Sequence, residues 1–205
     1  MSMPDLRQAV KEKYEIFDTG GVGELDVRAI LEQSGNRKIA DSLAANWQGG
    51  RYVAFRKLSG PAEPSTTADL ALFYASRWKT PESASRFARL YAAAMAQRYE
   101  KAAAQPTPAC SGGRCPTFAA YNTTEEGPTS VEQWPDNTVV VCESFDETTA
   151  TQLRSAWLET SSSTQAENLD QDELGLRLRE VPGFAAFQEQ IGRQILQLAI
   201  SASTH

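Results

Sequence analysis

Apolar side chains recur at helical spacing through the N-terminal part of this chain. One stripe predicts a helix over residues 4–17. Its members are Leu6, Val10, Tyr14 and Phe17. A second stripe around Val27 and Leu31 predicts a helix that stops near Gly35. A third helix is expected over residues 36–47, because apolar residues repeat every four positions there and a pair of glycines follows.

The pattern then changes to strands followed by one long helix. Residues 51–58 and 69–78 are rich in aromatic and aliphatic side chains, and a loop of Pro, Ser and Thr separates them. They predict an antiparallel pair of strands. Thr80 is suited to cap a helix that begins at Pro81, since proline is favoured at the first helical position. We therefore expect a helix over residues 81–100 with a broad apolar face.

The C-terminal half combines further strands with two helices. Three strands are predicted, over residues 118–122, 130–134 and 138–145. Asp146 is expected to cap a helix. Pro182 is expected to open a last helix, after a polar stretch that begins near Ser161.

Together these elements predict an α+β fold. We expect an antiparallel sheet of about four or five strands with the long helix packed on one face, helices at the N-terminal end and a C-terminal helix. One domain is expected over residues 1–160, helical over 4–47 and with the sheet and its helices over 51–158. Residues 161–205 are expected to form a polar linker and a helix that packs on the same domain.

The charge of the chain argues against a nucleic-acid partner. Its net charge is −6 and its pI is about 5.0, whereas a phosphate-binding surface needs clustered Lys and Arg. The nearest basic pair, Arg177 and Arg179, lies among acidic residues. No apolar run reaches the roughly 18 to 20 residues of a membrane span. We expect no nucleic-acid partner and no membrane span.

The single histidine removes most familiar enzyme chemistry. It is His205, the last residue, and a terminal residue is rarely held in place. Catalytic triads, Cys-His pairs and His-rich zinc sites all need a histidine fixed within the fold. We therefore expect the isolated chain not to be an enzyme, with no catalytic or metal-binding residues and no cofactor.

Three cysteines leave several alternatives open. Cys110 and Cys115 are separated by a short glycine-containing loop, so they form a disulfide, remain free thiols or take part in metal or redox chemistry. Cys142 lies in an apolar strand, where a buried, inert thiol is the usual interpretation.

Other candidate sites have simpler structural explanations. Residues 18–24 are rich in glycine, but the pattern places a helix before them, so a connector between helices is favoured over a phosphate-binding loop. Glu24 suits the first turn of the following helix. Asp170, Asp172 and Glu173 lack the spacing of a calcium loop, and a solvated linker is expected. The four tryptophans are expected to pack in the core; they are Trp47, Trp78, Trp134 and Trp157.

A stretch of about 75 residues resembles part of a known family. The order of residues is similar to "L-G-E … A … W-x-G-D-R/K-Y … W-D-S-x-x-D-A-x-x-F". The matching positions are Gly23, Glu24, Leu25, Ala40, Ala44, residues 47–52 and residues 78–87. This order resembles the C-terminal region of a family of large bacterial proteins, thought to be extracytoplasmic zinc metalloproteases. Gly50 and Lys79 stand where the pattern has aspartate, so no acidic role carries over to them.

The resemblance implies an accessory role. The family's catalytic His-Glu-x-x-His helix lies upstream of the matching region, and this chain contains no such motif. The expected function is a non-catalytic accessory or substrate-engaging domain, with an upstream peptidase domain or a protein substrate as partner and an extracytoplasmic location. The alternative is a free-standing module that binds a small ligand or a protein. An upstream His-Glu-x-x-His in the same reading frame would favour the first.

Overall fold

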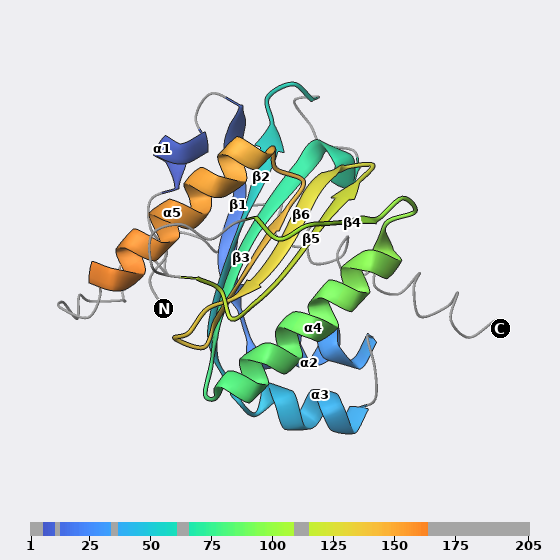
Figure 1. The fold of residues 1–205 in the computed structure, drawn as a ribbon, viewed down its shortest axis with the longest axis vertical. Helices are drawn as coiled ribbons and strands as arrows, with labels where there is room; N and C mark the ends of the chain where they lie inside the picture. The colour runs from blue at the N-terminus through green and yellow to red at the C-terminus, as the bar shows by residue number, and fades with distance from the viewer. Residues whose placement is uncertain (1–5, 11–12, 34–36, 61–65, 109–114, 164–205) are drawn as a thin grey trace.

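A central sheet lies between two layers of helices (Figure 1). The computed structural model describes residues 6–10, 13–33, 37–60, 66–108 and 115–163. The strands are β1 (Tyr14–Val22), β2 (Trp47–Lys57), β3 (Leu70–Trp78), β4 (Ala103–Gln105), β5 (Phe118–Thr124), β6 (Gly127–Gln133) and β7 (Thr138–Glu143). The helices are α1 (Arg7–Val10), α2 (Glu24–Gln33), α3 (Arg37–Ala44), α4 (Pro81–Arg98) and α5 (Glu147–Ser163), with a short 3-10 turn at Thr67–Asp69.

The sheet has seven strands in the order β1-β2-β3-β7-β6-β5-β4, and every neighbouring pair is antiparallel. Strand β7 lies at the centre, and its six residues are all buried. Strands β1 and β4 form the two edges of the described sheet. The predicted α+β class and antiparallel sheet are confirmed. The expected four or five strands were too few, because neither edge strand was recognised.

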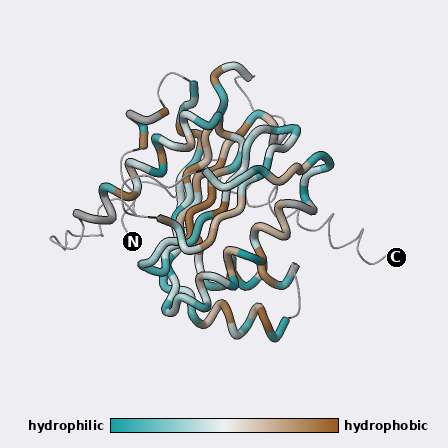
Figure 2. The backbone as a smooth tube through the Cα atoms, viewed as in Figure 1, coloured by the Kyte–Doolittle hydropathy of each residue, from teal (hydrophilic) through white to brown (hydrophobic). Residues whose placement is uncertain are grey.

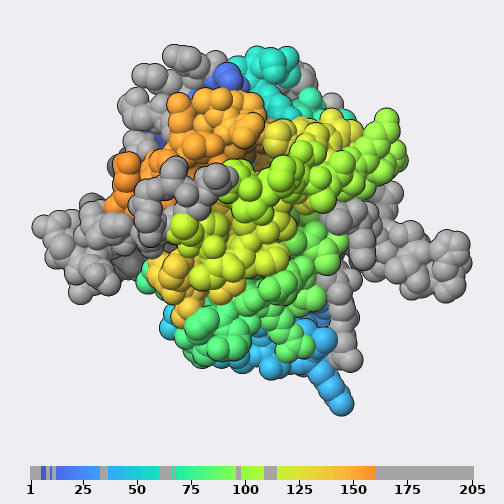
Figure 3. Space-filling model, viewed as in Figure 1, coloured from blue at the N-terminus to red at the C-terminus, as the bar shows by residue number. Residues whose placement is uncertain are grey.

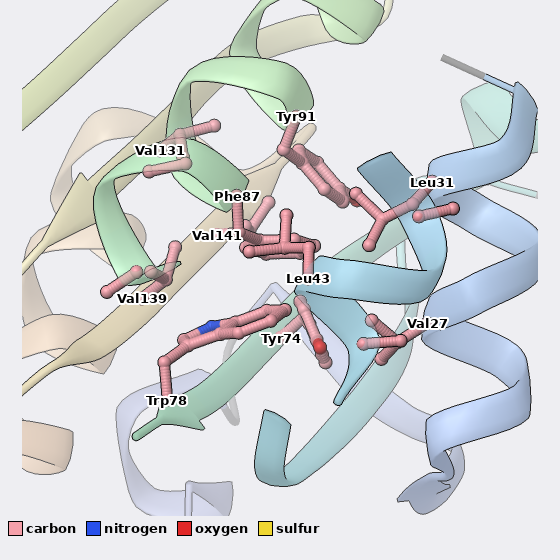
Figure 4. Packing of buried hydrophobic residues seen from close by; sticks show 14 of the residues in the cluster. Val27, Leu31, Leu43, Tyr74, Trp78, Phe87, Tyr91, Val131, Val139 and Val141 are labelled. Atoms are coloured by element: carbon pink, nitrogen blue, oxygen red, sulfur yellow. The ribbon is translucent and has the colours of Figure 1, made fainter. Parts of the chain in front are cut away.

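Each face of the sheet carries its own apolar core, as the alternation of side chains along a strand requires. On one face, Trp78 and Tyr74 of β3 pack against α2, α3 and α4. Figure 4 shows Phe87 of α4 close to Trp78, and their ring centroids are 4.6 Å apart. On the other face, Phe73 packs against Trp157 of α5. The tube coloured by hydropathy shows the apolar positions concentrated in the central strands (Figure 2).

Helix α4 forms where its start signals predicted. Thr80 has an extended backbone, and its hydroxyl accepts a hydrogen bond from the Ser83 N–H at 3.2 Å. Phe87 is fully buried and Tyr91 nearly so, whereas Arg86 and Arg89 are exposed. The predicted apolar face of this helix is therefore confirmed, and it lies against the sheet.

The N-terminal prediction was wrong in two places. The expected helix over residues 4–17 is only α1, and Tyr14 and Phe17 belong to strand β1. The third helix ends at Ala44, and Trp47 already begins β2 rather than closing the helix. In both places apolar residues happened to continue the four-residue spacing, although the backbone had already changed to strand.

Two glycines allow aromatic rings to pack closely on β1 and β2. A Cβ atom at Gly20 would lie 2.7 Å from the Tyr52 ring on the neighbouring strand. At Gly50 it would lie 3.1 Å from the Tyr74 ring. The absence of side chains here lets aromatic rings of β2 and β3 lie flat over their neighbours. Of the glycines that suggested a connector, Gly20 is thus a position where a ring covers the strand.

Some expectations fall on residues that the structure does not describe. The polar linker after residue 163, the helix opened by Pro182, and His205 all lie outside the described residues. No helix in the described part of the chain is long and apolar enough to cross a membrane.

Candidate functional site: two buried carboxylate clusters

Two glutamates lie inside the fold on opposite faces of the β6–β7 hairpin. Glu143 is 5% exposed and Glu132 is 1% exposed. Glu143 shares its face with Val141, which packs toward α4, whereas Glu132 lies beside Val140 on the face covered by α5. A buried carboxylate costs free energy unless it is paired, so its surroundings determine what it can do.

Glu143 is fully paired by helix α4 and the turn after it. Its Oε1 accepts a hydrogen bond from the Tyr91 hydroxyl at 2.7 Å. Its Oε2 accepts from Arg98 Nη1 at 2.8 Å and from the Tyr99 hydroxyl at 2.9 Å. Both oxygens are therefore occupied, and the three donors fix the C-terminal end of α4 against the centre of the sheet.

The three donors of this cluster stay protonated near neutral pH. Burial, and then the nearby charge of Glu143, raise the pKa of both Tyr91 and Tyr99, so these hydroxyls remain protonated donors. The carboxylate of Glu143 raises the pKa of Arg98, which stays a cation. The Glu143 cluster is therefore a fixed ion pair with two neutral hydroxyl donors.

Glu132 forms a second tie, to helix α5. Its Oε1 accepts hydrogen bonds from Arg154 of α5 and from the Tyr121 hydroxyl of β5. Arg154 also bonds Tyr121 at 3.2 Å, which closes the triangle of the three side chains. The second oxygen, Oε2, is buried and has no hydrogen-bond partner among the described residues. Burial raises the pKa of Tyr121, so it also remains a donor.

A third carboxylate holds the start of α5. Asp146 caps this helix, because its Oδ1 accepts a bond from the Thr149 N–H at 3.2 Å. The Tyr14 hydroxyl donates to Oδ2 at 3.3 Å, and Lys13 forms an ion pair with Oδ1 at 3.1 Å. Burial alone would raise the pKa of Asp146, but the bonds from Thr149 and Lys13 lower it to about 2. The predicted cap at Asp146 is confirmed.

The residues singled out from the sequence occupy structural positions. Glu24 is in the first turn of α2, as predicted, and forms an ion pair with Arg28 at 3.0 Å. The connector between helices expected at residues 18–24 was wrong, because these residues run from strand β1 into α2. At that junction the Gly23 N–H donates to Asp26 Oδ2 at 2.7 Å. A carboxylate therefore occupies the place that a phosphate would need.

The cysteines divide into two kinds. Cys115 is disulfide-bonded, whereas Cys110, its partner in one of the alternatives considered, lies outside the described residues. Cys142 is a free, buried thiol, as predicted. Burial, followed by the charge of Glu132, raises the pKa of Cys142 to about 12. The thiol therefore stays protonated and unreactive near neutral pH.

Three of the four tryptophans are buried as expected, and Trp47 is partly buried against the same core. The indole N–H of Trp78 donates to the Ser76 hydroxyl at 3.1 Å. Within the described residues, no group of three or more His, Cys, Asp or Glu side chains is placed to hold a metal ion. Asp170, Asp172 and Glu173 lie outside the described residues.

Neither Glu132 nor Glu143 was predicted from the sequence to be a buried, paired carboxylate. A signal was present in each case: Glu143 ends the apolar run of β7, and Glu132 follows Val131 within β6. A charged residue in a strand predicted to be buried needs a partner. Arg98 is the last residue of α4, and Arg154 lies in the middle of α5. Which arginine faces which glutamate depends on the fold, and the sequence alone does not tell it.

The fold and these clusters define a class: a three-layer α+β domain whose buried carboxylates tie its helices to an antiparallel sheet. The chain belongs to the family described as Domain of unknown function (DUF8575), whose model matches residues 12–154. The match covers every strand of the sheet and ends at Arg154, the partner of Glu132. Comparison with curated proteins gave no match, and comparison with solved structures gave none either.

Proposed function

We propose that this domain is a non-catalytic module that engages a protein substrate on behalf of a zinc-peptidase-like protein. The observation that carries the proposal is the state of Glu143. Both of its oxygens are already occupied by Arg98, Tyr91 and Tyr99. A general acid or base must reach the proton that it moves. This carboxylate instead holds α4 on the sheet.

The other ionisable groups of the interior support a scaffold in the same way. Glu132 is bound to Arg154 under α5, and the Cys142 thiol is buried with a raised pKa. In the space-filling view, α4 and α5 lie over their strands with atoms of β5 and β6 between them (Figure 3). Such an interior favours a rigid body that presents a binding surface, in keeping with the role of many accessory domains.

The link to a peptidase is supported by the sequence resemblance. Its motif residues have structural roles here: Trp78 ends β3, and Phe87 packs on Trp78. An extracytoplasmic location is supported by the disulfide at Cys115, since disulfides persist mainly in oxidising compartments.

A binding assay with an unfolded protein tests this function. The full chain would be titrated with fluorescently labelled, reduced and carboxymethylated α-lactalbumin, with and without added zinc. We expect saturable binding and an intact probe on a denaturing gel after prolonged incubation. Cleavage of the probe by the purified chain, or a failure to bind it, would overturn the proposal.

A further inference from the structure

We propose that the outer edge of strand β1 binds an extended peptide segment carrying basic side chains, which adds to the sheet as an eighth strand. This inference rests on the proposed function and names the surface and the partner that it requires. Strand addition uses the backbone groups of an edge strand for affinity and the neighbouring side chains for specificity.

The register shows which backbone groups of β1 point outward. The N–H of Leu58, the residue directly after β2, donates to the Lys13 carbonyl, so Leu58 faces the side of β1. Orientation alternates along an antiparallel strand, so Ala54, Tyr52 and Gly50 also face β1. The β1 residues paired with these three therefore direct their N–H and carbonyl groups toward β2. The β1 residues between them direct these groups away from β2. The outward-facing residues of this regular stretch are Thr19 and Gly21.

The hydrogen bonding of Thr19 agrees with this assignment. Its N–H donates to Asp18 Oδ1 at 2.8 Å rather than to β2. The N–H and carbonyl of Gly21 and the carbonyl of Thr19 point away from the sheet. Within the part of the chain that the structure describes, no strand pairs with this side of β1. Unpaired groups of this kind are a template for another strand.

Among the described residues, the face of the sheet at Gly21 has room for a small side chain. A Cβ atom added at Gly21 would meet only the Gly50 carbonyl oxygen, at 4.0 Å. At Gly20, one residue earlier, the same atom would strike the Tyr52 ring. Gly21 itself carries no side chain that an incoming strand would have to pass. The opposite edge is less suitable, because β4 has three residues and is followed directly by Pro106.

The charge along β1 identifies the partner as basic. Asp18 Oδ2 accepts from the Tyr52 hydroxyl at 2.8 Å, and Asp26 lies close enough for its charge to help raise the pKa of Tyr52, after burial and Asp18. Among the described residues, no lysine or arginine forms a salt bridge with either aspartate. A Lys or Arg side chain of an added strand would bring a positive charge to these aspartates.

Exposed apolar side chains precede and follow this stretch in the sequence. Phe17, at the bulge of β1, is 37% exposed, and Leu25, in the first turn of α2, is 77% exposed. They lie on either side of the stretch that contains Thr19 and Gly21. Apolar residues of a peptide could contact Phe17 and Leu25, and its basic residues could pair with the aspartates. A peptide that alternates apolar and basic residues therefore suits this stretch.

The test compares three labelled nine-residue peptides by fluorescence anisotropy with the full chain. They alternate Val with Lys, Val with Ser, or Val with Glu. We expect the Val/Lys peptide to bind at least about tenfold more tightly than the Val/Glu peptide, and this preference to shrink with added salt. Equal binding of the three peptides would overturn the proposal.

Two substitutions at one position test the edge itself. Gly21→Pro removes the outward N–H without disturbing the bonds to β2, whereas Gly21→Ala keeps it and fills open space. We expect at least about tenfold weaker binding of the Val/Lys peptide by Gly21→Pro and a change within about twofold for Gly21→Ala. Circular dichroism and the unfolding midpoint of each variant confirm that both are folded. Unchanged binding by a folded Gly21→Pro would overturn the inference.

The outcomes separate this inference from the proposed function. If the parent chain binds unfolded α-lactalbumin and Gly21→Pro binds it equally well, the β1 site is wrong and the proposed function stands. If the parent binds neither that protein nor the peptides, both fail. A dimer in sedimentation that Gly21→Pro abolishes would show that a second copy of this chain, not a basic peptide, occupies the edge.

Discussion

Arg98 of α4 and Glu143 of β7 form an ion pair of 2.8 Å in which the carboxylate side chain is only 7% exposed. Removing one member of a buried pair leaves the other uncompensated, at a cost of about 3 to 5 kcal/mol. Because the Arg98 side chain is 32% exposed, water relieves part of that cost. We therefore expect Glu143→Ala to lower the free energy of unfolding by about 2 to 4 kcal/mol. Urea denaturation followed by tryptophan fluorescence measures this.

Glu24→Ala is the matched control, because the Glu24 side chain is 50% exposed and its ion pair with Arg28 lies on the surface. Its loss should change the free energy of unfolding by less than about 1 kcal/mol. Equal effects of the two substitutions would mean that Glu143 is not the tie between α4 and the sheet.

Phe87→Ala tests the core on the α4 face. Phe87 is fully buried between Trp78 and Tyr91, so its truncation should leave a cavity and cost about 3 to 5 kcal/mol. Arg89→Ala is the exposed control on the same helix. Its guanidinium lies 4.6 Å from the Phe118 ring centroid, so we expect a loss of at most about 1 kcal/mol. An unchanged urea midpoint for Phe87→Ala would contradict the packing of this face.

Helix α4 and its buried face could be predicted from the sequence because both signals are local. Thr80 and Pro81 set the start of the helix, and the apolar stripe is long enough to fix its face. Strand β1 could not be predicted in the same way. It pairs with β2 and receives the Tyr52 ring at Gly20, and that partner is more than thirty residues away in the sequence.

The carboxylate clusters could not be predicted from the sequence for a related reason. Glu132 and Glu143 are near each other in the sequence, but the pleat of the sheet sends them to opposite faces. Each then meets an arginine from a different helix. The sequence shows that a charged residue lies in an apolar strand. Which arginine pairs with it depends on how the helices cross the sheet.

Two neighbouring glycines should respond in opposite ways to alanine. At Gly20 the added methyl would lie 2.7 Å from the Tyr52 ring, which is held by its bond to Asp18, so we expect a loss of about 1 to 3 kcal/mol. At Gly21 the methyl enters open space, and a neutral or slightly stabilising effect of up to about 1 kcal/mol is expected. Thermal unfolding of both variants checks this. A milder effect at Gly20 than at Gly21 would refute the ring contact.

Asp146 should make the start of α5 sensitive to acid. Its pKa is lowered from 3.8 to about 2 in the folded protein, so the folded state favours the ionised carboxylate. That stabilisation is present above pH 4 and is lost as the pH falls from about 4 toward 2. Asp146→Asn should therefore flatten the decline in urea midpoint between pH 5 and pH 2. Parallel profiles for parent and variant would contradict the role of this cap.

The most direct measurement for the whole account compares binding and cleavage by the parent chain, Glu132→Gln and Glu143→Gln. Each protein is incubated with labelled, unfolded α-lactalbumin and zinc at a temperature where all three remain folded. If these carboxylates only tie helices to the sheet, none of the proteins cleaves the probe, and the dissociation constants of the variants stay within about twofold of the parent value. If the parent cleaves the probe and either substitution abolishes that cleavage while binding persists, the carboxylate is catalytic and the account is wrong.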